Sequence, residues 1–251
     1  MKIDLSHSVW SRLYGPYGNR SVNTKLKTLA EQWDNGVASD LFWEELHHQD
    51  DIYLSTFASL PWLVDLSPSE GAAFEKTYLF LSHVIHCACT KGGTGCDGTG
   101  PRGKYRGLST NIADHQHSWI PQTEWLTIED QPILATLEQW FSDNHARMAE
   151  RCLSLLGSDP MISAYAIEGF ATANGSSRVA WSAQMFAAGE SIDFIAEEFG
   201  AYDERDTLAV AKLYPHLRAR NPALASFMVD FPGCTFDPDD PGQDSLASSQ
   251  S

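Results

Sequence analysis

Apolar side chains recur at three- and four-residue steps through most of the chain, and this spacing is typical of amphipathic α-helices. The longest run extends from about Glu129 to Leu156, where one apolar stripe would face a core. Clean alternation between apolar and polar residues, which would indicate a strand, does not continue beyond four or five residues anywhere. The sequence therefore predicts an all-α fold.

Capping residues and helix breakers divide this pattern into separate helices. Ser39 or Asp40 is expected to cap a helix that includes Leu41, and Pro68 lies near the start of another helix. Pro61 falls inside a predicted helix, where it removes a hydrogen bond and kinks the backbone. The predicted helices cover residues 22–33, 40–46, 53–66, 68–89, 129–156, 159–173, 178–188, 191–199, 205–214 and 222–231.

Two stretches depart from the helical pattern. Residues 90–107 hold seven glycines and four basic residues without an apolar period, which predicts an unusually long loop. Residues 235–251 are rich in aspartate and serine and are expected to form a disordered acidic tail. We therefore predict one all-α domain over residues 1–234, with the loop inserted in it. Antiparallel helix pairs of roughly 35 to 45 residues favour an α-solenoid, although no convincing internal repeat occurs.

The net charge of the chain is −16, and most of it lies in the second half. After Trp125 there are 7 basic and 19 acidic residues, so this half carries −12. Such a field repels phosphate backbones, which argues against nucleic acid as a ligand, and attracts basic proteins. Solubility alone is the alternative explanation of the charge.

The cellular compartment is predicted from two further features. No run of eighteen apolar residues and no signal peptide is found, so we expect a cytoplasmic protein without a membrane partner. The five cysteines are an odd number, and three of them crowd into residues 87–96. Reduced thiols in a reducing compartment fit this distribution best.

A short part of the chain resembles a bacterial HEAT-like family of helical proteins. The resemblance is carried by the segments Leu41–Gln49, Ile52–Tyr53 and Thr56–Leu66, in which a tryptophan helix ends in a His-Gln turn and a small-aromatic-Ala-x-x-Pro-aromatic-Leu-Val helix follows. It implies a HEAT-repeat-like scaffold without catalytic residues, in some cases with a role suggestive of immunity to a toxin. The residues that would pack and kink the first helix pair are Trp43, Tyr53, Pro61 and Trp62.

The sharpest chemical constellation is a group of histidines and cysteines that could bind metal. His83, His86 and Cys87 lie at three- and four-residue steps on one helix face, and Cys89 and Cys96 are close by. Four of these side chains could form a tetrahedral zinc site. The spacing Cys-x-Cys-x6-Cys is not a standard zinc motif, however, and small buried cysteines at a helix end are the alternative.

A glycine-rich motif for nucleotides is incomplete in this chain. The segment Gly98–Lys104 has the spacing of a phosphate-binding loop, but Tyr105 stands where a magnesium-binding serine or threonine is needed. Pro101 also removes an amide donor. We therefore expect no nucleotide, and no cofactor other than zinc.

Two functions follow from these patterns. The first is a non-enzymatic protein-binding scaffold, in particular an immunity protein that neutralises a basic toxin domain through an acidic surface. The alternative is a zinc-binding enzyme or sensor organised around the segment His83–Cys96. The sequence specifies neither the identity of the partner nor the oligomeric state.

Overall fold

The computed structural model describes residues 2–18, 21–48, 51–90 and 127–240. These ranges contain ten α-helices and one pair of two-residue strands, so the prediction of an all-α fold is confirmed. Within them, every helix is too short or too polar to cross a membrane. The predicted loop beyond Thr90, including Cys96, lies outside the described residues.

The chain divides into two compact units. Unit 1 comprises Met1–Phe80 and Ser109–His145, and unit 2 comprises Leu81–Leu108 and Ala146–Ser251. Two helices, α4 (Gly71–Thr90) and α5 (Gln131–Cys152), contribute residues to both. The single domain over residues 1–234 stays a prediction.

Unit 1 is built from short helices around one small hairpin. Its β1 and β2 strands pair antiparallel, with His47 opposite Ile52. The helix expected from Ser39 or Asp40 begins earlier, because Asp34 accepts hydrogen bonds from the amides of Gly36 and Val37, both at 2.8 Å. That predicted cap was therefore wrong. Besides the first parts of α4 and α5, the elements are η1 (Ser8–Arg12), α1 (Val22–Glu31), α2 (Asn35–Asp40), the π-helical turn η2 (Leu41–Glu45), β1 (His47–His48), β2 (Asp51–Ile52), α3 (Leu54–Leu66) and η6 (Ile128–Asp130).

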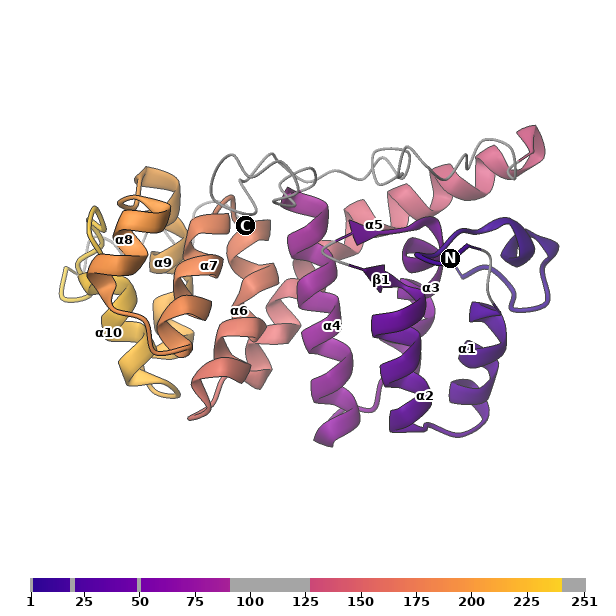
Figure 1. The fold of residues 1–251 in the computed structure, drawn as a ribbon, viewed down its shortest axis with the longest axis horizontal. Coiled ribbons are helices and arrows are strands. Elements are labelled where there is room, and N and C mark those ends of the chain that lie inside the picture. Colours follow the sequence, from indigo (N-terminus) through magenta and orange to yellow (C-terminus); the bar gives the residue numbers. More distant parts are fainter. Residues whose placement is uncertain (1, 19–20, 49–50, 91–126, 241–251) are drawn as a thin grey trace. The chain divides into compact units, whose positions relative to one another are not determined.

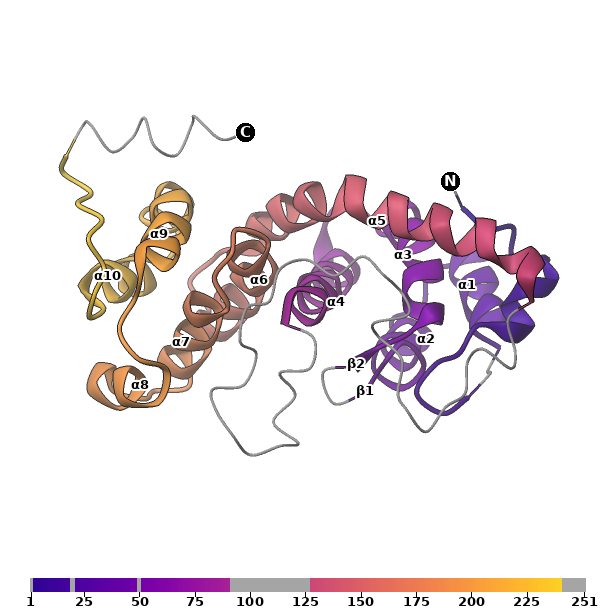
Figure 2. The same ribbon diagram turned by 90° about the horizontal axis from the view of Figure 1, so that it is seen from above.

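Helix α3 is the most buried helix segment described for unit 1, because nine of its thirteen residues are buried. It contains Pro61, as predicted, and continues on both sides of it. Figure 2 shows α5 passing alongside α3, and the rings of Phe57 and Phe141 meet edge to face at 5.1 Å between their centroids. Leu137 and Phe141, from the part of the predicted apolar stripe that belongs to unit 1, are thus buried in this unit.

The residues of the HEAT-like resemblance have different environments. Tyr53 and Pro61 are buried, and the indole nitrogen of Trp62 donates to the carbonyl of Ile3 at 2.9 Å. Trp43, in contrast, is 42% exposed, although its ring meets Phe80 edge to face. Tyr53, Pro61 and Trp62 therefore pack in unit 1. Trp43 contacts Phe80 with one part of its ring and exposes the remainder to solvent.

An ion pair joins η1, in the N-terminal segment of unit 1, to η6, which directly precedes α5. The guanidinium of Arg12 donates to both carboxylate oxygens of Asp130, at 2.9 and 2.6 Å, and Asp130 is nearly fully buried. The same carboxylate accepts from the amide and hydroxyl of Thr127. Hydrogen bonds from Arg12 chiefly hold the pKa of Asp130 well below its usual range, against the effect of burial.

The described part of unit 2 consists of the ends of α4 and α5, the short 3-10 helix η7 (Leu153–Leu155) and five further α-helices. Figure 1 shows α6 and α7 side by side. The predicted bounds are confirmed to within a few residues, except that α9 continues past the predicted end at Tyr214 with Pro215 inside it. The helices are α6 (Pro160–Ala173), α7 (Ser177–Ala187), α8 (Ile192–Phe199), α9 (Glu204–Leu217) and α10 (Pro222–Asp230), and their N-caps are Asp159, Ser176, Ser191, Asp203 and Asn221.

The packed part of unit 2 extends slightly beyond the predicted start of the tail. Phe236 is buried and meets Tyr214 edge to face, with 5.4 Å between the ring centroids. The acidic tail predicted for 235–251 therefore has an ordered beginning, and residues 241–251 lie outside the described part.

Replacing Asp130 with asparagine is expected to destabilise the protein by about 1–3 kcal/mol at neutral pH, because a charged partner of Arg12 is lost from a buried position. A lowered carboxyl pKa stabilises the fold above the pKa of the unfolded chain, so the difference between wild type and variant should shrink as pH falls below ~4. Urea unfolding at several pH values measures this difference in the free energy of unfolding. Asp65→Asn, which loses an exposed pair with Lys2, is the control and should cost less than about 1 kcal/mol.

Candidate functional site

The site in unit 2 begins with a close contact between α4 and α6. The hydroxyl of Ser82 donates to the carbonyl of Tyr165 at 2.8 Å and accepts from the amide of Gly169 at 2.7 Å. It thereby bridges two backbone groups of α6 that lie four residues apart, the spacing of a helical hydrogen bond. A Cβ atom on Gly169 would lie 2.7 Å from the carbonyl oxygen of Ser82, so the two helices meet where α6 has no side chain.

This contact places the neighbouring residues, His83 and Glu168, opposite one another. Nδ1 of His83 lies 3.2 Å from Oε1 of Glu168. Nε2 of His86 lies 3.8 Å from the same oxygen. The side chain of Glu168 is only 2% exposed, so a buried carboxylate stands between two imidazoles.

The negative charge of Glu168 and the positive charge of His83 stabilise each other. Burial alone would raise the pKa of Glu168, but the adjacent His83 and His86 outweigh it and the pKa is lowered. Burial would likewise lower the pKa of His83, but Cys87 and Glu168 outweigh it and raise the pKa well above its ordinary value. Glu168 is therefore ionised at neutral pH, and Nδ1 of His83 donates to it because a carboxylate can only accept.

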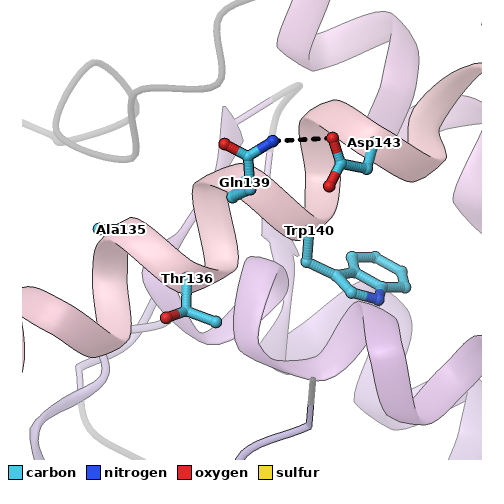
Figure 3. A pocket seen from close by; sticks show the side chains of 5 residues that line it. All are labelled: Ala135, Thr136, Gln139, Trp140 and Asp143. Carbon is cyan, nitrogen blue, oxygen red and sulfur yellow. Dashed lines mark hydrogen bonds between the residues drawn. The ribbon is translucent and has the colours of Figure 1, made fainter.

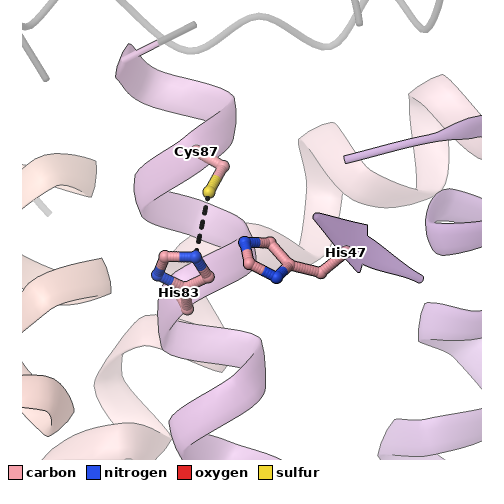
Figure 4. Close-up of side chains that lie close together, drawn as sticks. All are labelled: His47, His83 and Cys87. Carbon is pink, nitrogen blue, oxygen red and sulfur yellow. Dashed lines mark hydrogen bonds between the residues drawn. The ribbon is translucent and has the colours of Figure 1, made fainter. Parts of the chain in front are cut away.

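The second ring nitrogen of His83 faces a thiol. Nε2 lies 3.4 Å from Sγ of Cys87, one turn further along α4, and Figure 4 shows the two side chains pointing toward each other. The spacing of four residues on a rigid helix produces this approach. The result is a continuous chain of polar contacts from Cys87 through His83 to Glu168.

The predicted metal ligands thus have different neighbours. His83 and Cys87 are brought together, whereas the ring of His86 faces Glu168 and meets Trp181 edge to face at 5.4 Å. Cys89 is buried, which raises the pKa of its thiol to about 12 despite a hydrogen bond with Thr172. Cys96 lies outside the described residues.

Glu168 is the member of this cluster that sequence reasoning missed. It is far from His83 along the chain and belongs to no motif. The one available signal was its position in α6, where it is the only charged residue between Pro160 and Ala173. A lone acid in an apolar helix is a candidate for a buried ionised group.

A second feature of unit 2 is an acidic surface around α8. Ile195 is fully buried, whereas four of the other seven residues of this short helix are exposed. Phe194 is 41% exposed among the acids, and residues 188–204 include no lysine or arginine. We call this set the α8 acidic surface, made of Glu190, Asp193, Phe194, Glu197 and Glu198, all of them exposed.

Unit 1 has surface hollows beside α5. One of about 350 Å³ is lined by five residues, among which Gln139 donates to Asp143 at 2.8 Å (Figure 3). Another of about 290 Å³ lies between the N-terminal segment and the start of α5. The residues of the first are Ala135, Thr136, Gln139, Trp140 and Asp143, and those of the second are Lys2, Ile3, Asp4, His7, Pro132, Ile133, Thr136 and Leu137.

Comparison with known proteins found no relative. No family model matches the chain, and neither the curated proteins nor the solved structures include a match.

Replacing Gly169 with alanine is expected to destabilise the protein by about 1–3 kcal/mol, because the new methyl group would push against the backbone of Ser82. An alanine normally favours a helix over glycine, so the sign of the change is diagnostic. Thermal and urea unfolding give the measurement. Gly157→Ala serves as the control, since its Cβ would meet nothing closer than 3.9 Å, and a loss of equal size there would contradict the explanation.

Proposed function

We propose that this protein is a non-enzymatic binding scaffold whose partner is a basic protein domain. Its form would be an α-solenoid of antiparallel helix pairs, as the HEAT-like resemblance suggests. An immunity protein that covers a basic toxin domain and excludes the toxin's substrate is the specific version of this proposal. The α8 acidic surface is the single observation that supports it most.

The α8 acidic surface has the composition that a basic partner needs. Four carboxylates are exposed within nine residues, and no basic side chain of that segment neutralises them. Opposite charges across an interface steer the encounter and fix its register, which raises the association rate. Phe194 adds an apolar side chain of the aromatic kind that interface cores favour.

Neutralising these acids should weaken capture of the partner. The test variant carries Glu190→Gln, Asp193→Asn, Glu197→Gln and Glu198→Gln, and the control carries Glu31→Gln, Glu44→Gln, Glu70→Gln and Glu150→Gln, which change the charge by the same amount at other exposed positions. Both are used as bait in the native host at low salt, with quantitative mass spectrometry of what elutes at high salt.

The expected result is a basic protein retained by wild type and by the control, and retained roughly tenfold less by the test variant. Equal loss in both variants would mean that only net charge matters. Absence of any protein that elutes with salt would contradict the scaffold proposal itself.

A further inference from the structure

The cluster on α4 and α6 supports a second inference, which goes beyond the proposed docking function and does not depend on it. We propose that His83 and Cys87 bind a zinc ion through Nε2 and Sγ, and that Glu168 is the positioning residue that orients His83. The metal is identified by its ligands, because one imidazole nitrogen and one sulfur suit a borderline-soft divalent ion.

The separation of the two ligand atoms fits tetrahedral zinc. Zn–N bonds of about 2.0–2.1 Å and a Zn–S bond of about 2.3 Å, at a tetrahedral angle, place the nitrogen and the sulfur about 3.6 Å apart. Nε2 of His83 and Sγ of Cys87 are 3.4 Å apart. An ion can therefore be accommodated between them by side-chain adjustment of a few tenths of an ångström, with α4 unchanged.

The contacts of His83 are those of a metal-binding histidine. A ligating imidazole almost always donates its other N–H to a carboxylate or carbonyl, which fixes the ring and makes the ligating nitrogen more basic. Here Nδ1 is 3.2 Å from the buried carboxylate of Glu168. The contact between Ser82 and Gly169 holds that carboxylate in place.

Zinc binding in this arrangement displaces protons. The Cys87 sulfur binds as a thiolate, so its proton leaves to solvent, together with any proton on Nε2 of His83. The proton on Nδ1 stays in its hydrogen bond to Glu168. The buried charge of Glu168 then partly compensates the charge of the ion, which a neutral side chain would not do.

Three other histidine or cysteine side chains of unit 2 contact groups other than His83 and the Cys87 sulfur. His86 meets the same oxygen of Glu168 from its own side and stacks edge to face on Trp181. Cys89 and Cys152 are buried thiols: Cys89 forms a hydrogen bond with Thr172, and Cys152 donates to the carbonyl of Met148 and also contacts Ser82. These two cysteines supply matched controls, because each is a buried thiol of the same unit.

The experiment uses the full chain, purified and stripped of metal, with zinc chloride and cobalt chloride as probes. Zinc affinity is measured by competition with a chromophoric chelator, and cobalt binding by its thiolate charge-transfer absorption in the near ultraviolet. The variants are Cys87→Ser and Glu168→Gln, and the controls are Cys89→Ser and Cys152→Ser. Circular dichroism of each variant establishes that it is folded.

We expect one zinc per chain and a cobalt–thiolate band in the wild type. Cys87→Ser should abolish the band, Glu168→Gln should weaken zinc binding about 10- to 100-fold while retaining the band, and both controls should behave as wild type. The wild-type spectrum decides even if a variant fails to fold. A wild type without a band at saturating cobalt, or a band lost equally in Cys89→Ser, would overturn the proposal.

Discussion

The contact between Ser82 and Gly169 is the constraint on which the site in unit 2 depends. Because α6 has no Cβ at Gly169, the hydroxyl of Ser82 reaches the backbone of α6. There it donates to the carbonyl of Tyr165 and accepts from the amide of Gly169. That contact fixes which residues of the two helices face each other. His83 is the residue after Ser82 and Glu168 is the residue before Gly169, so the pairing of His83 with Glu168 is a consequence of this contact.

A buried carboxylate is costly unless it is paired, and here two imidazoles offset the cost. The pairing has a chemical consequence, because it assigns Nδ1 of His83 to Glu168 and leaves Nε2 facing Cys87. The cluster is thus both a structural connection between α4 and α6 and a preorganised pair of metal-type ligands. The α8 acidic surface, in the same unit, differs in kind because its charges are exposed.

Much of the fold could be predicted from sequence, because periodicity and caps are local signals. Asp159 marks the start of α6, whereas the start of α2 was misplaced because Asp34 competed with two plausible caps further on. The pairing of His83 with Cys87 could also be predicted, since four residues form one helical turn. Glu168 could not, because its role depends on a helix contact that a single sequence does not encode locally.

The chemistry of the cluster depends on one interaction, in which ionised Glu168 holds the proton on Nδ1 of His83. Nuclear magnetic resonance of the metal-free protein, labelled with ¹⁵N in histidine and assigned with a His83→Gln variant, tests it directly. We expect a slowly exchanging Nδ1–H of His83 at neutral pH, and its loss or marked shift in Glu168→Gln. A His83 ring that carries its proton only on Nε2, or whose signal is the same in both proteins, would contradict it.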